Sequence, residues 1–162
     1  MFTSVFVLIM VCVGGGTGWW CRDRQCATAN KRLEVECLDV TYEHCIETTD
    51  SLYFNESPEV AVGALLSFVG ILTPFVEAGF VEGEHATPYK VSLALAHGRL
   101  AKIFLQFHLE DRARLHIAEA IRCYGGLQAH DGWHPPTIAN ADQVLQAVLD
   151  ADDAGDPINW KM

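Results

Sequence analysis

The sequence predicts an all-α protein on the strength of three observations. Apolar residues after position 30 recur at three- and four-residue spacing, and no stretch alternates as a half-buried strand would. Proline and capping signals precede the apolar segments, and glycines follow them. Half of the 162 residues are hydrophobic, which is enough for one core. We therefore expect one helical domain over residues 31–155, after an apolar segment (1–30) and before a tail (156–162).

Five helices are expected within this domain. The clearest start signals are Ser57 before Pro58 and Thr87 before Pro88, because proline suits the first turn of a helix. Glu110 and Asp111 favour the positive end of another helix, which stops at two glycines. The expected ranges are about 33–47, 58–72, 88–107, 111–124 and 136–154.

The third and fourth of these helices form an antiparallel hairpin in this interpretation, with a turn at His108 and Leu109. Two helices joined by a short turn approach closely only where small residues meet. The predicted seam consists of Leu100, Ala101 and Phe104 on one helix and Ala113, Ile117 and Ala120 on the other. This spacing resembles a tetratricopeptide repeat, although His97, His108 and Gly125 stand where that repeat prefers Trp, Gly and Pro.

The segments around the hairpin extend the resemblance. Gly132, His134 and Pro135 match a turn in the long repeats of kinesin light chains and in the C-terminal helical domain of SET-and-MYND lysine methyltransferases. The stretch ILTPF at 71–75 is also similar to the methyltransferase version. The sequence contains neither the Asn-His-x-Cys and Gly-Glu-Glu-Leu elements of a SET domain nor the paired zinc knuckles of a MYND finger. The resemblance therefore implies a helical-domain remnant that is not an enzyme and needs no cofactor or metal.

The charge pattern indicates protein partners. A net charge of −10 argues against binding to nucleic acid. Eleven acids and no Lys or Arg lie between Leu33 and Tyr89, whereas the hairpin that follows is basic. Arg99 and Lys102 are expected to point away from the helix seam and to hold an acidic peptide. The alternatives are that these cations are solvated surface charges, or that the chain's own acidic flanks occupy the groove.

The N-terminal segment leaves the location of the protein open. The apolar run from Val5 to Val13 is too short for stable insertion across a membrane, which takes about 20 residues. We expect a cytoplasmic or nuclear protein with reduced thiols. The alternative is a small secreted ligand or effector, cleaved near Gly18, with disulfides among four cysteines: Cys21, Cys26, Cys37 and Cys45. Self-association is also expected, because about three repeats are usually needed for a stable helical stack.

Overall fold

The computed structural model describes residues 39–77, 79, 83–127, 129 and 134–154. The chain divides into two units, Met1–Asp39 and Val40–Met162, and the elements below belong to the second. The predicted apolar segment, the cleavage site near Gly18, three of the four cysteines of the secreted alternative and the tail lie outside the described residues. Cys45 and Cys123 are free thiols.

The described elements confirm the all-α prediction. Residues 39–55 form a helix, and they are followed by α3 (Pro58–Glu77), the short 3-10 helix η1 (Gly83–Ala86), α4 (Thr87–Gln106), α5 (Glu110–Gly125) and α6 (Ala141–Asp153). Within the described ranges, no residue is in a strand. Helices α3, α4 and α5 begin within a few residues of the predicted starts, and α3 ends five residues later than predicted. The end of the first helix was predicted wrongly, because the helix continues to residue 55 instead of ending near 47; its expected start at 33 lies outside the described residues.

The start of the last helix was predicted wrongly. Residues 134–139 are not helical, and α6 begins at Ala141 instead of near Pro136. The reason is a cap, because the Asn140 side chain accepts a hydrogen bond from the backbone N–H of Gln143 at 3.0 Å. The Gln143 side chain in turn accepts from the backbone N–H of Ala139 at 2.8 Å, which satisfies a second backbone donor.

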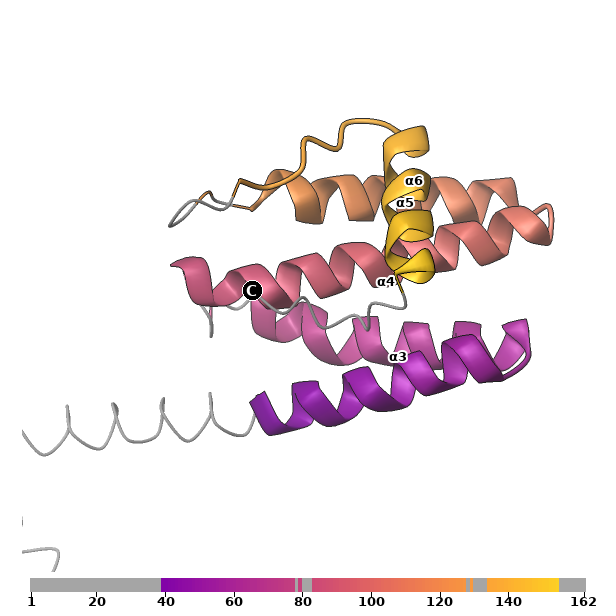
Figure 1. Ribbon diagram of the computed structural model, residues 1–162, viewed down its shortest axis with the longest axis horizontal. Coiled ribbons are helices and arrows are strands. Elements are labelled where there is room, and N and C mark those ends of the chain that lie inside the picture. Colours follow the sequence, from indigo (N-terminus) through magenta and orange to yellow (C-terminus); the bar gives the residue numbers. More distant parts are fainter. Residues whose placement is uncertain (1–38, 78, 80–82, 128, 130–133, 155–162) are drawn as a thin grey trace, which may run out of the picture. The chain divides into compact units, whose positions relative to one another are not determined.

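Helix α4 is the centre of the core. Every residue from Val91 to Ala101 is buried, whichever face of the helix it occupies, and α4 packs against α3, α5 and α6 (Figure 1). The helix over 39–55 also reaches it, because the hydroxyl groups of Tyr42 and Ser92 are 2.7 Å apart. The burial of this central stretch explains why its sequence is rich in small and apolar residues.

The contact between α4 and α5 contains the residues predicted for the seam. Ala101, Ala113 and Ala120 have no exposed surface, and neither has Leu100. Phe104 is also buried, whereas Ile117 is half-buried. The backbone N–H of Leu109 donates to the carbonyl of Phe104 in the turn between the two helices. The relationship of this pair to tetratricopeptide repeats stays a prediction.

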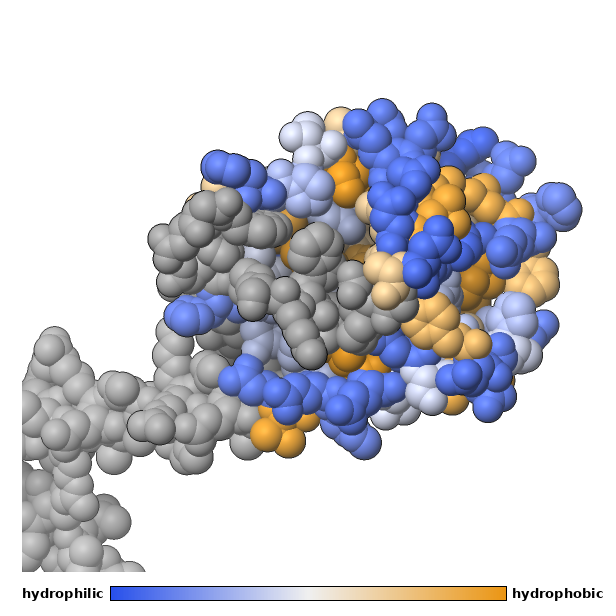
Figure 2. All heavy atoms as spheres, viewed as in Figure 1, coloured by the Kyte–Doolittle hydropathy of each residue, from blue (hydrophilic) through white to orange (hydrophobic). Residues whose placement is uncertain are grey.

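Helix α3 exposes much of its apolar surface. Its buried residues lie along one stripe facing α4, namely Ala61, Leu65, Phe68 and Leu72, while Val60, Leu66 and Ile71 are each about two-fifths exposed. In Figure 2, apolar side chains likewise reach the surface between hydrophilic ones. By length and composition α3 could cross a membrane, a test that the core helix of a soluble protein also passes.

Gly98 lets α6 approach α4. A Cβ at this position would lie 2.5 Å from Val148 Cγ2 and 3.3 Å from Val144 Cγ1, and these two valines are the buried residues of α6. The backbone of α4 therefore meets the side chains of α6 without an intervening methyl group.

We predict opposite effects for two glycine substitutions. Gly98→Ala should destabilise the protein by about 1 to 3 kcal/mol, because the added methyl overpacks the contact with Val148. The matched control is Gly63→Ala in α3, where nothing lies within 4 Å of the new Cβ; there alanine should stabilise by about 1 kcal/mol through its higher helix propensity. Urea denaturation measures both, and equal effects would contradict the close packing of α6 on α4.

Candidate functional site

The structure corrects the expected acidic-peptide clamp. Arg99 was expected to be exposed on a groove, but it has no exposed surface. Its guanidinium forms ion pairs with Asp50 at 2.6 Å and with Asp152 at 3.0 Å. It also lies over the ring of Tyr53, with Cζ 4.4 Å from the ring centroid. Arg99 is therefore a structural residue whose charge is compensated inside the protein.

Lys102 belongs to the same cluster. Its side chain is 28 % exposed, and Nζ lies 2.7 Å from Asp152. The Tyr53 hydroxyl donates to the same carboxylate at 2.8 Å. Burial and the neighbouring Asp152 raise the pKa of Tyr53 well above its ordinary value, so the phenol keeps its proton. The acids that occupy the predicted clamp are thus Asp50 and Asp152, which belong to the acidic segments on either side of the hairpin, as the alternative interpretation of the sequence expected.

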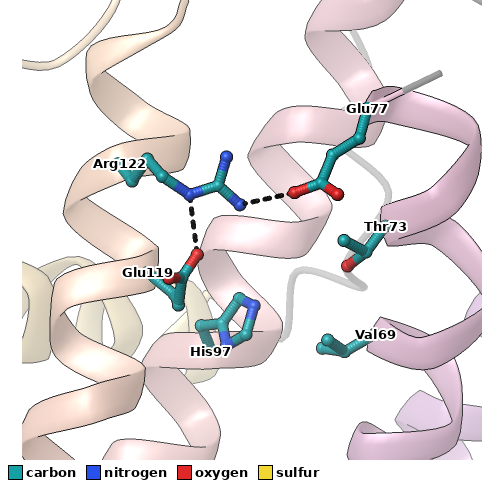
Figure 3. A pocket seen from close by; sticks show the side chains of 6 residues that line it. All are labelled: Val69, Thr73, Glu77, His97, Glu119 and Arg122. Carbon is teal, nitrogen blue, oxygen red and sulfur yellow. Dashed lines mark hydrogen bonds and ion pairs between the residues drawn. The ribbon is translucent and has the colours of Figure 1, made fainter. Parts of the chain in front are cut away.

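A groove opens elsewhere on α4. It has a volume of about 490 Å³ and lies between α3 and α5. Figure 3 shows its lining, with His97 on the floor supplied by α4. One wall belongs to α3 and the other to α5; the wall residues are Val69, Thr73 and Glu77 on α3 and Glu119 and Arg122 on α5.

His97 is the polar group at the bottom of this groove. It is only 6 % exposed, and its Nδ1 lies 2.9 Å from the Nδ1 of His116 on α5. The His116 ring in turn stacks on Phe104. In the part of the chain that the structure describes, the His97 Nε2 atom has no hydrogen-bond partner, and Figure 3 shows a ring nitrogen facing into the groove.

The two imidazoles are neutral at physiological pH. Burial is the largest cause that lowers the pKa of His97 to about 4; the nearby His116 and Arg122 act in the same direction, and Glu119 opposes the shift. Burial lowers the pKa of His116 too. In the bond between the two Nδ1 atoms one ring donates and the other accepts, so the tautomer of His97 is coupled to that of His116.

Arg122 connects the two walls of the groove. Its Nε donates to Glu119 at 2.7 Å, and its second nitrogen reaches Glu77 of α3 at 3.4 Å (Figure 3). All three side chains are about half exposed. The hydrogen bond to Glu119 raises the pKa of Arg122, which keeps its charge. The group Glu77, Arg122 and Glu119 therefore carries one net negative charge at the groove opening.

The described residues that line the groove provide hydrogen-bonding, charged and apolar groups. Burial raises the pKa of Cys123, so its thiol is protonated, and it does not line the groove. His108 is exposed in the turn after α4. Among the residues with described positions, no three His, Cys, Asp or Glu side chains gather as a metal site would require.

A second groove of about 420 Å³ lies between the helix over 39–55 and α3. Its walls include Leu52, Val60 and Phe68, and no Asp, Glu, Lys or Arg lines it. Its lining also contains His44, Cys45, Thr48, Thr49 and Ser67, so it offers polar groups but no carboxylate, ammonium or guanidinium group. The groove over His97 combines the apolar contact of Val69 with charged side chains and a buried imidazole, and it is therefore the candidate site.

We predict that loss of the buried cation destabilises the fold strongly. Arg99→Met leaves Asp50 and Asp152 without their shared partner, and breaking a buried ion pair in this way costs about 3 to 5 kcal/mol. The control is Arg114→Met, because Arg114 is 73 % exposed and forms only surface pairs. Urea denaturation compares the two variants. A cost for Arg99→Met no larger than that for Arg114→Met would contradict the structural role.

We also predict a pH dependence that comes from His97. His97 binds a proton near pH 6.5 in the unfolded state but only near pH 4 in the folded state. Above about pH 6.5 the ring is neutral in both states, so it does not lower the stability of the fold. Stability then falls as the pH drops toward 4, by about 3 kcal/mol for a shift of this size. His97→Gln should lose this part of the slope, whereas the exposed-site control His108→Gln should keep it. Parallel slopes for wild type and His97→Gln would contradict the burial of a neutral imidazole.

No protein-family model, no curated protein and no solved structure matches this chain. The resemblance to tetratricopeptide repeats and to SET-and-MYND proteins therefore stays a prediction from the sequence. A functional proposal for this chain therefore rests on the geometry of the groove between α3 and α5.

Proposed function

We propose that the protein is a non-catalytic protein-interaction module that binds a peptide segment of a partner in the groove between α3 and α5. The observation that carries this proposal is the buried His97 ring, whose Nε2 faces the groove without a partner in the described residues. A polar atom buried in this way costs free energy unless a ligand or water satisfies it. The groove thus has a polar anchor at its floor.

The walls suit an extended peptide. Val69 gives an apolar contact on α3, and Glu77, Glu119 and Arg122 surround the opening. Groove sites on helical proteins commonly combine apolar contacts with a few polar groups that orient the bound chain. The resemblance of the hairpin to interaction repeats, and the lack of SET-domain elements in the sequence, support the same type of function.

We propose a different peptide site from the one predicted from the sequence. Arg99 and Lys102 hold acids of the chain itself, so an acidic peptide would have to displace Asp152 from both cations. The groove over His97 needs no such displacement. We therefore place partner binding on the α3 and α5 side of α4.

A displayed library of random peptides tests the proposal. Peptides selected on the full chain should lose binding to Thr73→Trp, because the indole fills the groove from the α3 wall. The matched control is Leu115→Trp, since Leu115 is 69 % exposed on α5 and does not line the groove. Circular dichroism checks that both variants are folded. Selected peptides that bind Thr73→Trp as well as wild type would contradict the proposal, as would the absence of any selected binder.

A further inference from the structure

The polar atoms that face the groove are mostly hydrogen-bond acceptors. Arg122 donates to Glu119 Oε2 and to Glu77 Oε1, which leaves the second oxygen of each carboxylate without a partner among the described side chains. The Thr73 hydroxyl faces the same space, as Figure 3 shows. A ligand that fits these groups must supply several N–H or O–H donors.

The imidazole of His97 on the floor of the groove can also accept a hydrogen bond from such a ligand. His97 is neutral, and its Nε2 accepts a hydrogen bond whenever its Nδ1 carries the proton and donates to His116. The exchange of roles between the two Nδ1 atoms allows this tautomer without any movement of the rings. A donor that enters the groove thus finds an acceptor on the floor and carboxylate oxygens on both walls.

Charge favours a cationic donor. Glu77, Glu119 and Arg122 together carry one net negative charge, and a single positive charge would neutralise the group. A carboxylate would instead approach two glutamates, and the cation in the described lining, Arg122, already binds both of them. Like charges at this distance repel, so acidic ligands are disfavoured.

The α3 wall suits the stem of a long basic side chain. Val69 and Thr73 lie one turn apart on α3, on the way from the floor to Glu77 (Figure 3). Methylene groups of lysine or arginine pack readily along such a surface while the charged end reaches polar groups. The volume of about 490 Å³ accommodates one such side chain with part of its backbone.

From these observations we infer that the groove recognises a basic side chain of the partner, lysine or arginine, held by Glu77, Glu119 and His97 Nε2. The inference rests on the proposed function, because it names the chemistry of the peptide that the groove binds. It also inverts the charge of the ligand expected from the sequence, which was acidic.

Three blocked amino acids test the inference: Nα-acetyl-lysine methylamide, its arginine counterpart and the neutral norleucine counterpart. Each is titrated into the full chain with ¹⁵N-labelled histidine, and the ring nitrogens are followed by NMR. The lysine or the arginine probe should shift the His97 signals toward the tautomer with an unprotonated Nε2, and norleucine should not. The two basic probes also show which of the two side chains binds more tightly.

A matched pair of variants tests whether Glu119 binds the charged end of the basic probe. Glu119→Gln should weaken the basic probe by about two- to fivefold, as expected for a partly exposed charge pair. Glu110→Gln is the control on the same helix, because Glu110 is exposed and pairs with Arg114 instead. Equal shifts with norleucine, or equal affinities for both variants, would overturn the inference.

The two proposals fail in different ways. Library peptides that bind the open groove but contain no essential Lys or Arg would overturn the inference and leave the proposed function standing. Peptides that bind Thr73→Trp as well as wild type would contradict the proposed function. The probe titration would then test the basic-side-chain site independently. Shifts of His97 by the basic probes alone support the site in either case.

Discussion

The buried guanidinium of Arg99 is the interaction on which the arrangement of three helices depends. It joins α4 to Asp50 on the helix over 39–55 and to Asp152 on α6. A charge without solvent contact is tolerated only when it is paired and hydrogen-bonded. Because its partners come from positions 49 and 53 residues away, these helices must pack on α4 together. Removing either acid takes away one of the two ion pairs of a cation that cannot reach water.

This constraint is also related to where the open groove lies on α4. His97 and Arg99 are two residues apart on α4, and two residues of an α-helix are about 200° apart around its axis. The charged cluster therefore occupies one side of α4, and the imidazole faces the other, between α3 and α5. Gly98 stands between them, where α6 approaches most closely. Closure of one side by α6 leaves the opposite side as the open groove.

The sequence predicts local features well and this site poorly. The burial of Ala101, Ala113 and Ala120 follows from helical spacing, and so do the helix starts at proline. The turn residue His108 has a φ of 57°, which explains why a glycine is preferred at that point of similar hairpins. The burial of Arg99 has no local signal, because its partners are distant in sequence. The pairing of His97 with His116 depends on tertiary packing for the same reason.

The expectation of an exposed cationic surface fails for a physical reason. The basic run from Lys90 to Arg122 suggests a cationic surface if each charge is assumed to face solvent. In the structure Arg99 and Lys102 are compensated by Asp50 and Asp152, and Arg122 is compensated by two glutamates. What a ligand meets is the charge that remains after such internal pairing. At the groove over His97 the remaining charge is negative, and the exposed polar atoms are mostly hydrogen-bond acceptors. The segment that supplies its floor and one wall is nevertheless basic in sequence.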